Sequence, residues 1–210
     1  LAEESGLIGD VGAWVLREAV RHAAAWRRAG TPVLAGAMVG VNVSWRQVSQ
    51  PTLVDEVVAA LDEHGLEPAA LCVEVTESAL MEDCGRSRAT LRRLRALGVR
   101  ISLDDFGTGH SSLSVLRDFP LDSLKLDRSF LSGGGDWEIV EAVCRMARSM
   151  ELRVVAEGIE EPRQAERAAR LGCDFGQGWL YCHPLPAAEL EAEVARLATA
   201  LRRGGPARVA

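Results

Sequence analysis

The stretch Val39-Gly40-Val41-Asn42-Val43 predicts a strand, with its valines on one face and its asparagine on the other. Four later stretches repeat this plan: one face is apolar, and the other carries a polar or ionisable residue near the carboxyl end of the strand. The residues so placed are Glu74, Asp104, Lys125 and Glu157. In a barrel of alternating strands and helices, the carboxyl ends of the strands meet at one rim, so we expect these side chains to converge with Asn42.

Helical patterns fill the intervals between the strands, and several of them end at a glycine. The predicted helices run over residues 11–26, 54–64, 87–97 and 164–171. The predicted strands run over residues 38–44, 71–77, 100–105, 123–127, 153–157 and 174–180. Helices and strands in alternation are typical of an α/β domain. The sequence therefore predicts an α/β domain with about six parallel strands and flanking helices.

Composition and charge argue against some classes of function. The formal net charge of −6 over 210 residues argues against binding along duplex nucleic acid. Five cysteines without metal-ligand spacing indicate reduced thiols, and no apolar run predicts a membrane span. We therefore expect a cytoplasmic domain over residues 1–203 and a flexible tail over 204–210. Because the chain begins with Leu1, we also expect a longer polypeptide that continues upstream, with room for a membrane anchor or sensor.

The converging acids predict a metal site. Glu74, Asp104, Asp105 and Glu157 would repel one another unless positive charge lies among them, and Lys125 alone is too little. Carboxylates with one asparagine amide suit Mg²⁺ or Mn²⁺ better than zinc, because no histidine or cysteine belongs to the set. The adjacent pair at 104 and 105 could serve two metals, an arrangement suited to in-line attack on a phosphodiester.

Six segments follow one another along the chain: 41–44 (VNVS), 74–77 (EVTE), 104–113 (DDFGTGHSSL), 125–130 (KLDRSF), 155–160 (VAEGIE) and 177–179 (QGW). They resemble, in order, the signature motifs of EAL-domain cyclic di-GMP phosphodiesterases. The resemblance implies a TIM-type (β/α) barrel, incomplete here, with about six parallel strands and flanking helices. It also implies hydrolysis of cyclic di-GMP to linear pGpG, a two-metal site with Mg²⁺ or Mn²⁺, and a homodimer. Upstream sensory or GGDEF-type domains are also in keeping with it.

The resemblance also implies roles for individual residues. The implied metal ligands are Asn42, Glu74, Asp104, Asp105 and Glu157. Glu157, Lys125 and Asp105 are the implied catalytic residues, with Lys125 holding the attacking water and phosphate. Glu77 is the implied anchor of the loop at 106–112. The positions implied to contact substrate or to support the ligands are Asp127, Glu160, Gln177 and Trp179.

This sequence departs from the family pattern at its start. The two strands that precede the first helix in the family, with the Glu-Ala-Leu triplet that names it, have no counterpart in residues 1–210. Smaller departures are His110, Trp179 and His183, where tyrosine, tyrosine and a basic residue are usual. An alternative therefore stays open: a catalytically inactive sensor that binds cyclic di-GMP, or a protein-interaction module.

Overall fold

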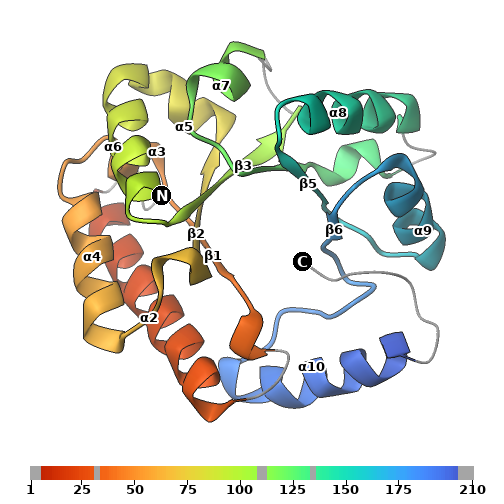
Figure 1. Cartoon of the computed structure of the whole chain (residues 1–210), viewed down its shortest axis with the longest axis horizontal. Coiled ribbons are helices and arrows are strands. Elements are labelled where there is room, and N and C mark those ends of the chain that lie inside the picture. Colours follow the sequence, from red (N-terminus) through yellow and green to blue (C-terminus); the bar gives the residue numbers. More distant parts are fainter. Residues whose placement is uncertain (1–5, 31–33, 108–112, 133–135, 203–210) are drawn as a thin grey trace. The chain divides into compact units, whose positions relative to one another are not determined.

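The computed structural model describes residues 6–30, 34–107, 113–132 and 136–202. Helices and strands alternate through these residues (Figure 1). The strands follow the sheet order β1-β2-β3-β4-β5-β6, so neighbours in the sheet are also successive along the chain. The pairs β1–β2, β4–β5 and β5–β6 are parallel. Parallel neighbours joined through helices confirm the predicted α/β class with six strands.

The chain divides into two compact units, residues 1–103 with 111–121 and residues 104–110 with 122–210. The helices of the first unit are α2 (Ile8–Ala29), α3 (Trp45–Val48), α4 (Leu53–His64), α5 (Glu77–Glu82), α6 (Cys84–Ala96) and α7 (Leu113–Asp118), with the short turns η1 (Leu34–Gly36) and η2 (Pro68–Ala70). Its strands are β1 (Val39–Asn42), β2 (Leu71–Thr76) and the first part of β3 (Arg100–Phe106).

The second unit holds the end of β3 and the remaining elements. They are β4 (Ser123–Leu126), η3 (Arg128–Phe130), α8 (Trp137–Ser149), β5 (Arg153–Ala156), α9 (Pro162–Leu171), β6 (Phe175–Gly176) and α10 (Ala187–Arg202). Within this unit α8 packs on β5, and α9 packs on both α8 and β6. The predicted tail at 204–210 lies outside the described residues.

The predicted helix ends are confirmed. Helices α2, α4 and α9 end at Gly30, Gly65 and Gly172, each in the left-handed conformation that a residue with a Cβ adopts only at a cost. Helix α6 ends two residues before Gly98, whose φ is also positive. The short helix α3 was not predicted, although Ser44 and Gln47 form a capping box at its start.

The sixth strand is shorter than predicted. The sequence suggested a strand over 174–180, but β6 covers only Phe175–Gly176. The Gln177 N–H still donates to the carbonyl of Ala156 at 2.9 Å. At the next residue the chain lies directly on a neighbouring backbone, since a Cβ on Gly178 would fall 2.2 Å from the carbonyl oxygen of Ile159. The chain turns at this close contact, and the strand ends before it.

Candidate metal centre and active site

Three predicted ligands gather in the second unit. Asp104 and Asp105 lie near the carboxyl end of strand β3, and Glu157 directly follows β5. One carboxylate oxygen from each lies within 4.8 Å of the others. The side chains come from strand ends that the alternation pattern had placed at one rim. Two strands thus supply a compact all-oxygen cluster.

Backbone geometry explains how neighbouring residues share this cluster. In a regular strand, Asp104 and Asp105 would point to opposite faces. Asp105 instead has a φ of +53°, a left-handed conformation that aspartate tolerates better than most residues. Its N–H donates to Oδ1 of Asp104 at 3.0 Å. The turn at residue 105 therefore brings both carboxylates to the same side as Glu157.

Lys125, in β4, neutralises part of the cluster. Its Nζ lies 3.2 Å from Oδ1 of Asp104 and 2.7 Å from Oε1 of Glu157. Lys125 and Asp104 are only 6% and 9% exposed, so this ion pair is largely removed from water. A buried ammonium between two carboxylates satisfies charges that would otherwise be costly to bury.

The basic residues of the chain add a second observation about Lys125. Of the 24 lysines and arginines, it is the only lysine. Lysine is a compact point charge with rotatable donors, whereas guanidinium is a wide planar fork. A chain that uses arginine at every other basic position but lysine here indicates that this position requires the smaller cation. This signal was present in the sequence and was missed.

The charge balance of the cluster remains negative. Burial raises the pKa of Asp105, and the neighbouring charges of Asp104 and Asp127 raise it further, while Lys125 acts in the opposite direction. Three carboxylates face one ammonium, so the cluster can accept additional positive charge. Hard divalent cations prefer such oxygen ligands, and the residues present therefore fit a metal of this class.

The first unit positions two further predicted ligands. Asn42 and Glu74 are direct partners in the parallel register of β1 and β2, and the Val43 N–H donates to the Glu74 carbonyl at 2.8 Å. The Glu74 side chain lies over Gly40, where a Cβ would fall 2.2 Å from its Oε1. Gly40 thus provides the space for this carboxylate, a role that the sequence pattern did not reveal.

Glu77, the predicted loop anchor, is the first residue of α5 and is buried. The Thr76 hydroxyl caps this helix by accepting from the Ala79 N–H at 3.3 Å. Most of the loop that Glu77 was predicted to steady, residues 108–112 with His110, lies outside the described residues. The anchoring role therefore stays a prediction.

The predicted substrate-contacting residues all belong to the second unit. Asp127 accepts from the Ser129 N–H at 2.9 Å. Partial burial raises the pKa of Asp127, but the hydrogen bonds from Ser129, together with the backbone hydrogen bond and the charge of Arg128, outweigh it and leave the pKa lowered. Glu160 and Gln177 are exposed. Trp179 is 58% exposed, and its ring lies 5.1 Å from that of His183, centroid to centroid.

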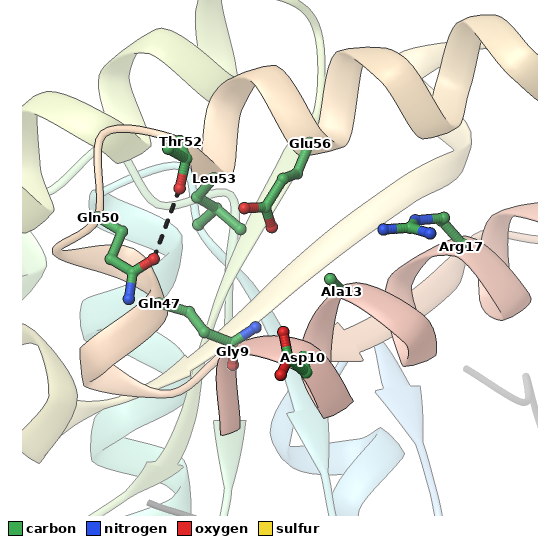
Figure 2. A pocket seen from close by; sticks show the side chains of 9 residues that line it. All are labelled: Gly9, Asp10, Ala13, Arg17, Gln47, Gln50, Thr52, Leu53 and Glu56. Atoms are coloured by element: carbon green, nitrogen blue, oxygen red, sulfur yellow. Dashed lines mark hydrogen bonds between the residues drawn. The ribbon is translucent and has the colours of Figure 1, made fainter. Parts of the chain in front are cut away.

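A separate pocket of about 260 Å³ lies in the first unit, between α2, α3 and α4 (Figure 2). Asp10 and Arg17 line it from α2, and Glu56 lines it from α4. The Gln47 side chain forms part of its wall (Figure 2). None of the lining residues is among the predicted site residues, so this pocket is distinct from the carboxylate cluster.

Comparison with known proteins identifies the family. The EAL domain model matches residues 1–184.

The chain belongs to the EAL domain family.

Curated relatives of this EAL domain include two proteins of Pseudomonas aeruginosa. The bifunctional diguanylate cyclase/cyclic di-GMP phosphodiesterase MucR is 45% identical over 199 residues, which cover 93% of this chain and 29% of MucR. The cyclic di-GMP phosphodiesterase NbdA is 45% identical over 195 residues, covering 91% of this chain and 24% of NbdA. The chain thus spans less than a third of the length of either relative.

Solved structures of other proteins share the fold. The PaMucR phosphodiesterase in complex with c-di-GMP has a TM-score of 0.84 and 44% identity, covering 90% of this chain and 77% of that one. Klebsiella pneumoniae BlrP1 in a manganese/cy-diGMP complex has a TM-score of 0.68 and 28% identity, covering 80% and 45%. A calcium/cy-diGMP complex of BlrP1 matches equally well. The predicted TIM-type fold and family are therefore confirmed. Among the described residues, no helix combines the length and apolar character of a membrane span.

Proposed function

We propose that this EAL domain is a metal-dependent phosphodiesterase that hydrolyses cyclic di-GMP to linear pGpG. The observation that carries the proposal is the buried lysine between Asp104 and Glu157, at 3.2 and 2.7 Å, beside the third carboxylate of Asp105. The names of MucR and NbdA, each 45% identical to this chain, support the substrate.

Asp104, Asp105 and Glu157 would hold the metal, and the family resemblance adds Asn42 and Glu74 as proposed ligands. Bound divalent cations would supply an acidified water and neutralise charge on the phosphate. Glu157 then has two proposed tasks, ligation and orientation of the attacking water. Its carboxylate is suited to the second because an ionised oxygen accepts a hydrogen bond from water.

Lys125 contributes through its fixed position. Two carboxylates hold its ammonium in place, so it needs no reorganisation when negative charge develops on the phosphoryl oxygens. Because Lys125 is 6% exposed, its charge acts through protein rather than through bulk water, and its effect on the reacting group is correspondingly larger.

The proposed substrate contacts lie on exposed residues around this cluster. Trp179 offers a flat apolar surface on which a guanine base could stack. Asp127, Glu160 and Gln177 are proposed to contact substrate or to support the ligands. Because Asp127 has a lowered pKa, it is ionised near neutral pH and can accept hydrogen bonds from a guanine edge.

Several finer features belong to this proposal. Mg²⁺ or Mn²⁺ is the proposed metal, in line with the oxygen ligands and with the manganese complex of BlrP1. The family model ends at residue 184, and we propose that α10 also belongs to the domain, which then extends to 203. A homodimer, a cytoplasmic location and upstream sensory or GGDEF-type domains remain predictions.

The test is conversion of cyclic di-GMP to pGpG, measured by chromatography with Mg²⁺ or Mn²⁺. The 210-residue chain is compared with one extended upstream by the two strands that the family resemblance implies. Glu157→Gln keeps the side-chain size but removes the charge, and Glu141→Gln, at an exposed ion pair on α8, is the matched control. We expect turnover to fall at least about 100-fold in the first variant only. Binding of cyclic di-GMP without turnover by either chain would instead favour a sensor.

A further inference from the structure

Two cysteines that are far apart in sequence meet in the second unit. Cys144 lies on the buried face of α8, and Cys173 lies between α9 and β6. Their sulfur atoms are 3.5 Å apart. A disulfide bond is about 2.05 Å long, so closing it requires a combined movement of roughly 1.5 Å. This distance is within the reach of small side-chain rotations.

The backbone around Cys173 holds it in this position. The Cys173 N–H donates to the carbonyl of Ala168 at 3.0 Å, at the end of α9. The next residue, Asp174, makes two hydrogen bonds to one residue of β5: its N–H donates to the Val154 carbonyl, and its carboxylate accepts from the Val154 N–H, each at 2.8 Å. Cys173 therefore lies between two anchored points.

The preceding glycine allows the close approach to α8. Gly172 has a φ of +103°, and a Cβ there would lie 2.7 Å from Arg148 and 3.8 Å from the Cβ of Cys144. The turn after α9 thus lies in van der Waals range of the helix that carries Cys144. Cys144 is 2% exposed, while Cys173 is partly accessible, so a small oxidant has an approach from one side.

The thiols also polarise each other. The hydrogen bond between them lowers the pKa of Cys144 and raises that of Cys173, whose burial raises its pKa further. Thiolate character is therefore favoured on Cys144, while in the neutral pair either sulfur can donate the hydrogen bond. A thiolate next to a second thiol is the arrangement in which oxidation proceeds to a disulfide.

We propose that Cys144 and Cys173 form an oxidisable dithiol site that hydrogen peroxide converts to a disulfide linking α8 to the turn between α9 and β6. In the first step, the sulfur of one cysteine attacks peroxide, the O–O bond breaks, and a sulfenic acid and water result. The other thiol then attacks the sulfenyl sulfur and releases a second water. Overall, two thiols are oxidised, one peroxide is reduced to two waters, and one S–S bond forms.

The bridge would link α8 to the turn between α9 and β6, within the second unit. It would close a loop between residues 29 apart in sequence, which constrains the unfolded chain. A loop of this size predicts a rise in Tm on the order of 5–10 °C for a chain of about 200 residues. The expected effect is therefore on stability and is separate from turnover.

The experiment treats the 210-residue chain with hydrogen peroxide, blocks the remaining thiols and maps tryptic peptides by mass spectrometry. Trypsin leaves Cys144 in the peptide 129–145, and leaves Cys173 together with Cys182 in the peptide 171–196. The chain therefore carries Cys182→Ser, so that the linkage is unambiguous. Cys84→Ser, at an exposed thiol in the first unit, is the matched control.

We expect the two peptides to be joined, with a mass two hydrogens below their sum, and the Tm to rise on oxidation. Cys144→Ala and Cys173→Ala should each abolish both changes, whereas Cys84→Ser should keep them. The proposal is overturned if the peptides remain unlinked, or if the Tm rise persists in either alanine variant. If an alanine variant fails to fold, the peptide map of the Cys182→Ser chain is sufficient: linked peptides support the proposal, and unlinked peptides overturn it.

Discussion

Replacing Lys125 with methionine removes the only ammonium from the carboxylate cluster and keeps a side chain of similar length. In the parent protein the two ion pairs, at 3.2 and 2.7 Å, are each worth about 5–6 kcal/mol at an effective dielectric constant of about 20. Desolvation offsets much of this attraction. Removal of one partner from a buried pair typically costs about 3–5 kcal/mol, because the other charge is left unpaired.

The expected result is a loss of about 3 kcal/mol in the free energy of unfolding, measured by urea denaturation at pH 7 with a metal chelator. The matched control is Arg145→Met, which breaks the exposed pair with Glu141 at 2.9 Å, where the side chains are 68% and 46% exposed. That change should cost no more than about 0.5 kcal/mol.

Added Mn²⁺ should narrow the gap between the Lys125→Met variant and the parent, since a bound cation would replace the missing positive charge. The reasoning is refuted if Lys125→Met and Arg145→Met destabilise the protein equally. It is also refuted if Mn²⁺ leaves the gap unchanged, because Lys125 would then not be compensating charge in a cation-binding cluster.

Three further outcomes are expected. Folding raises the pKa of Asp105 above its ordinary value of about 3.8, so the folded state holds this proton more tightly than the unfolded state does. The free energy of unfolding should therefore fall as pH rises from about 3.8 to the raised pKa. Asp105→Asn should remove that slope in pH-dependent urea denaturation and stabilise the metal-free protein at pH 7 by a few tenths of a kcal/mol, while abolishing turnover. Gly40→Ala should displace the Glu74 carboxylate and weaken Mn²⁺ binding about tenfold by calorimetry, whereas Gly36→Ala, with open space around it, should not. Gly178→Ala should lower the free energy of unfolding by about 2 kcal/mol or more, since its Cβ has no room; an unchanged denaturation midpoint would contradict the close contact.

The position of the acidic cluster could be predicted from the sequence because strand alternation is a local property. In a strand, a polar residue between apolar neighbours lies on the opposite face from them, so the sequence alone indicates its direction. Parallel strands then bring their carboxyl ends, with these polar residues, to one rim. Asp104, Lys125 and Glu157 do meet in this way. The family motifs then indicated cyclic di-GMP as the substrate, which a pattern of buried and exposed residues cannot identify.

Other features depend on tertiary contacts that leave no periodic signal. The left-handed backbone of Asp105 reverses the face on which its side chain lies, and alternation alone predicts the opposite. The early end of β6 follows from the contact between Gly178 and Ile159. The meeting of Cys144 and Cys173, 29 residues apart, likewise depends on how α9 turns back onto α8. The sequence therefore predicted reduced thiols but did not indicate that these two would meet.

The solitary lysine has a practical consequence for measuring how the second unit opens. A protease that cuts only after lysine has a single target in this chain, the bond between Lys125 and Leu126. Both residues lie in strand β4 and are buried, at 6% and 0% exposure, so the folded protein shields the bond. Where opening and closing are fast relative to cleavage, the cutting rate reports the population of opened molecules. The amounts of the two products on a gel would then report how strongly metal, substrate or a Cys144–Cys173 crosslink reduces the opening of this strand at the site.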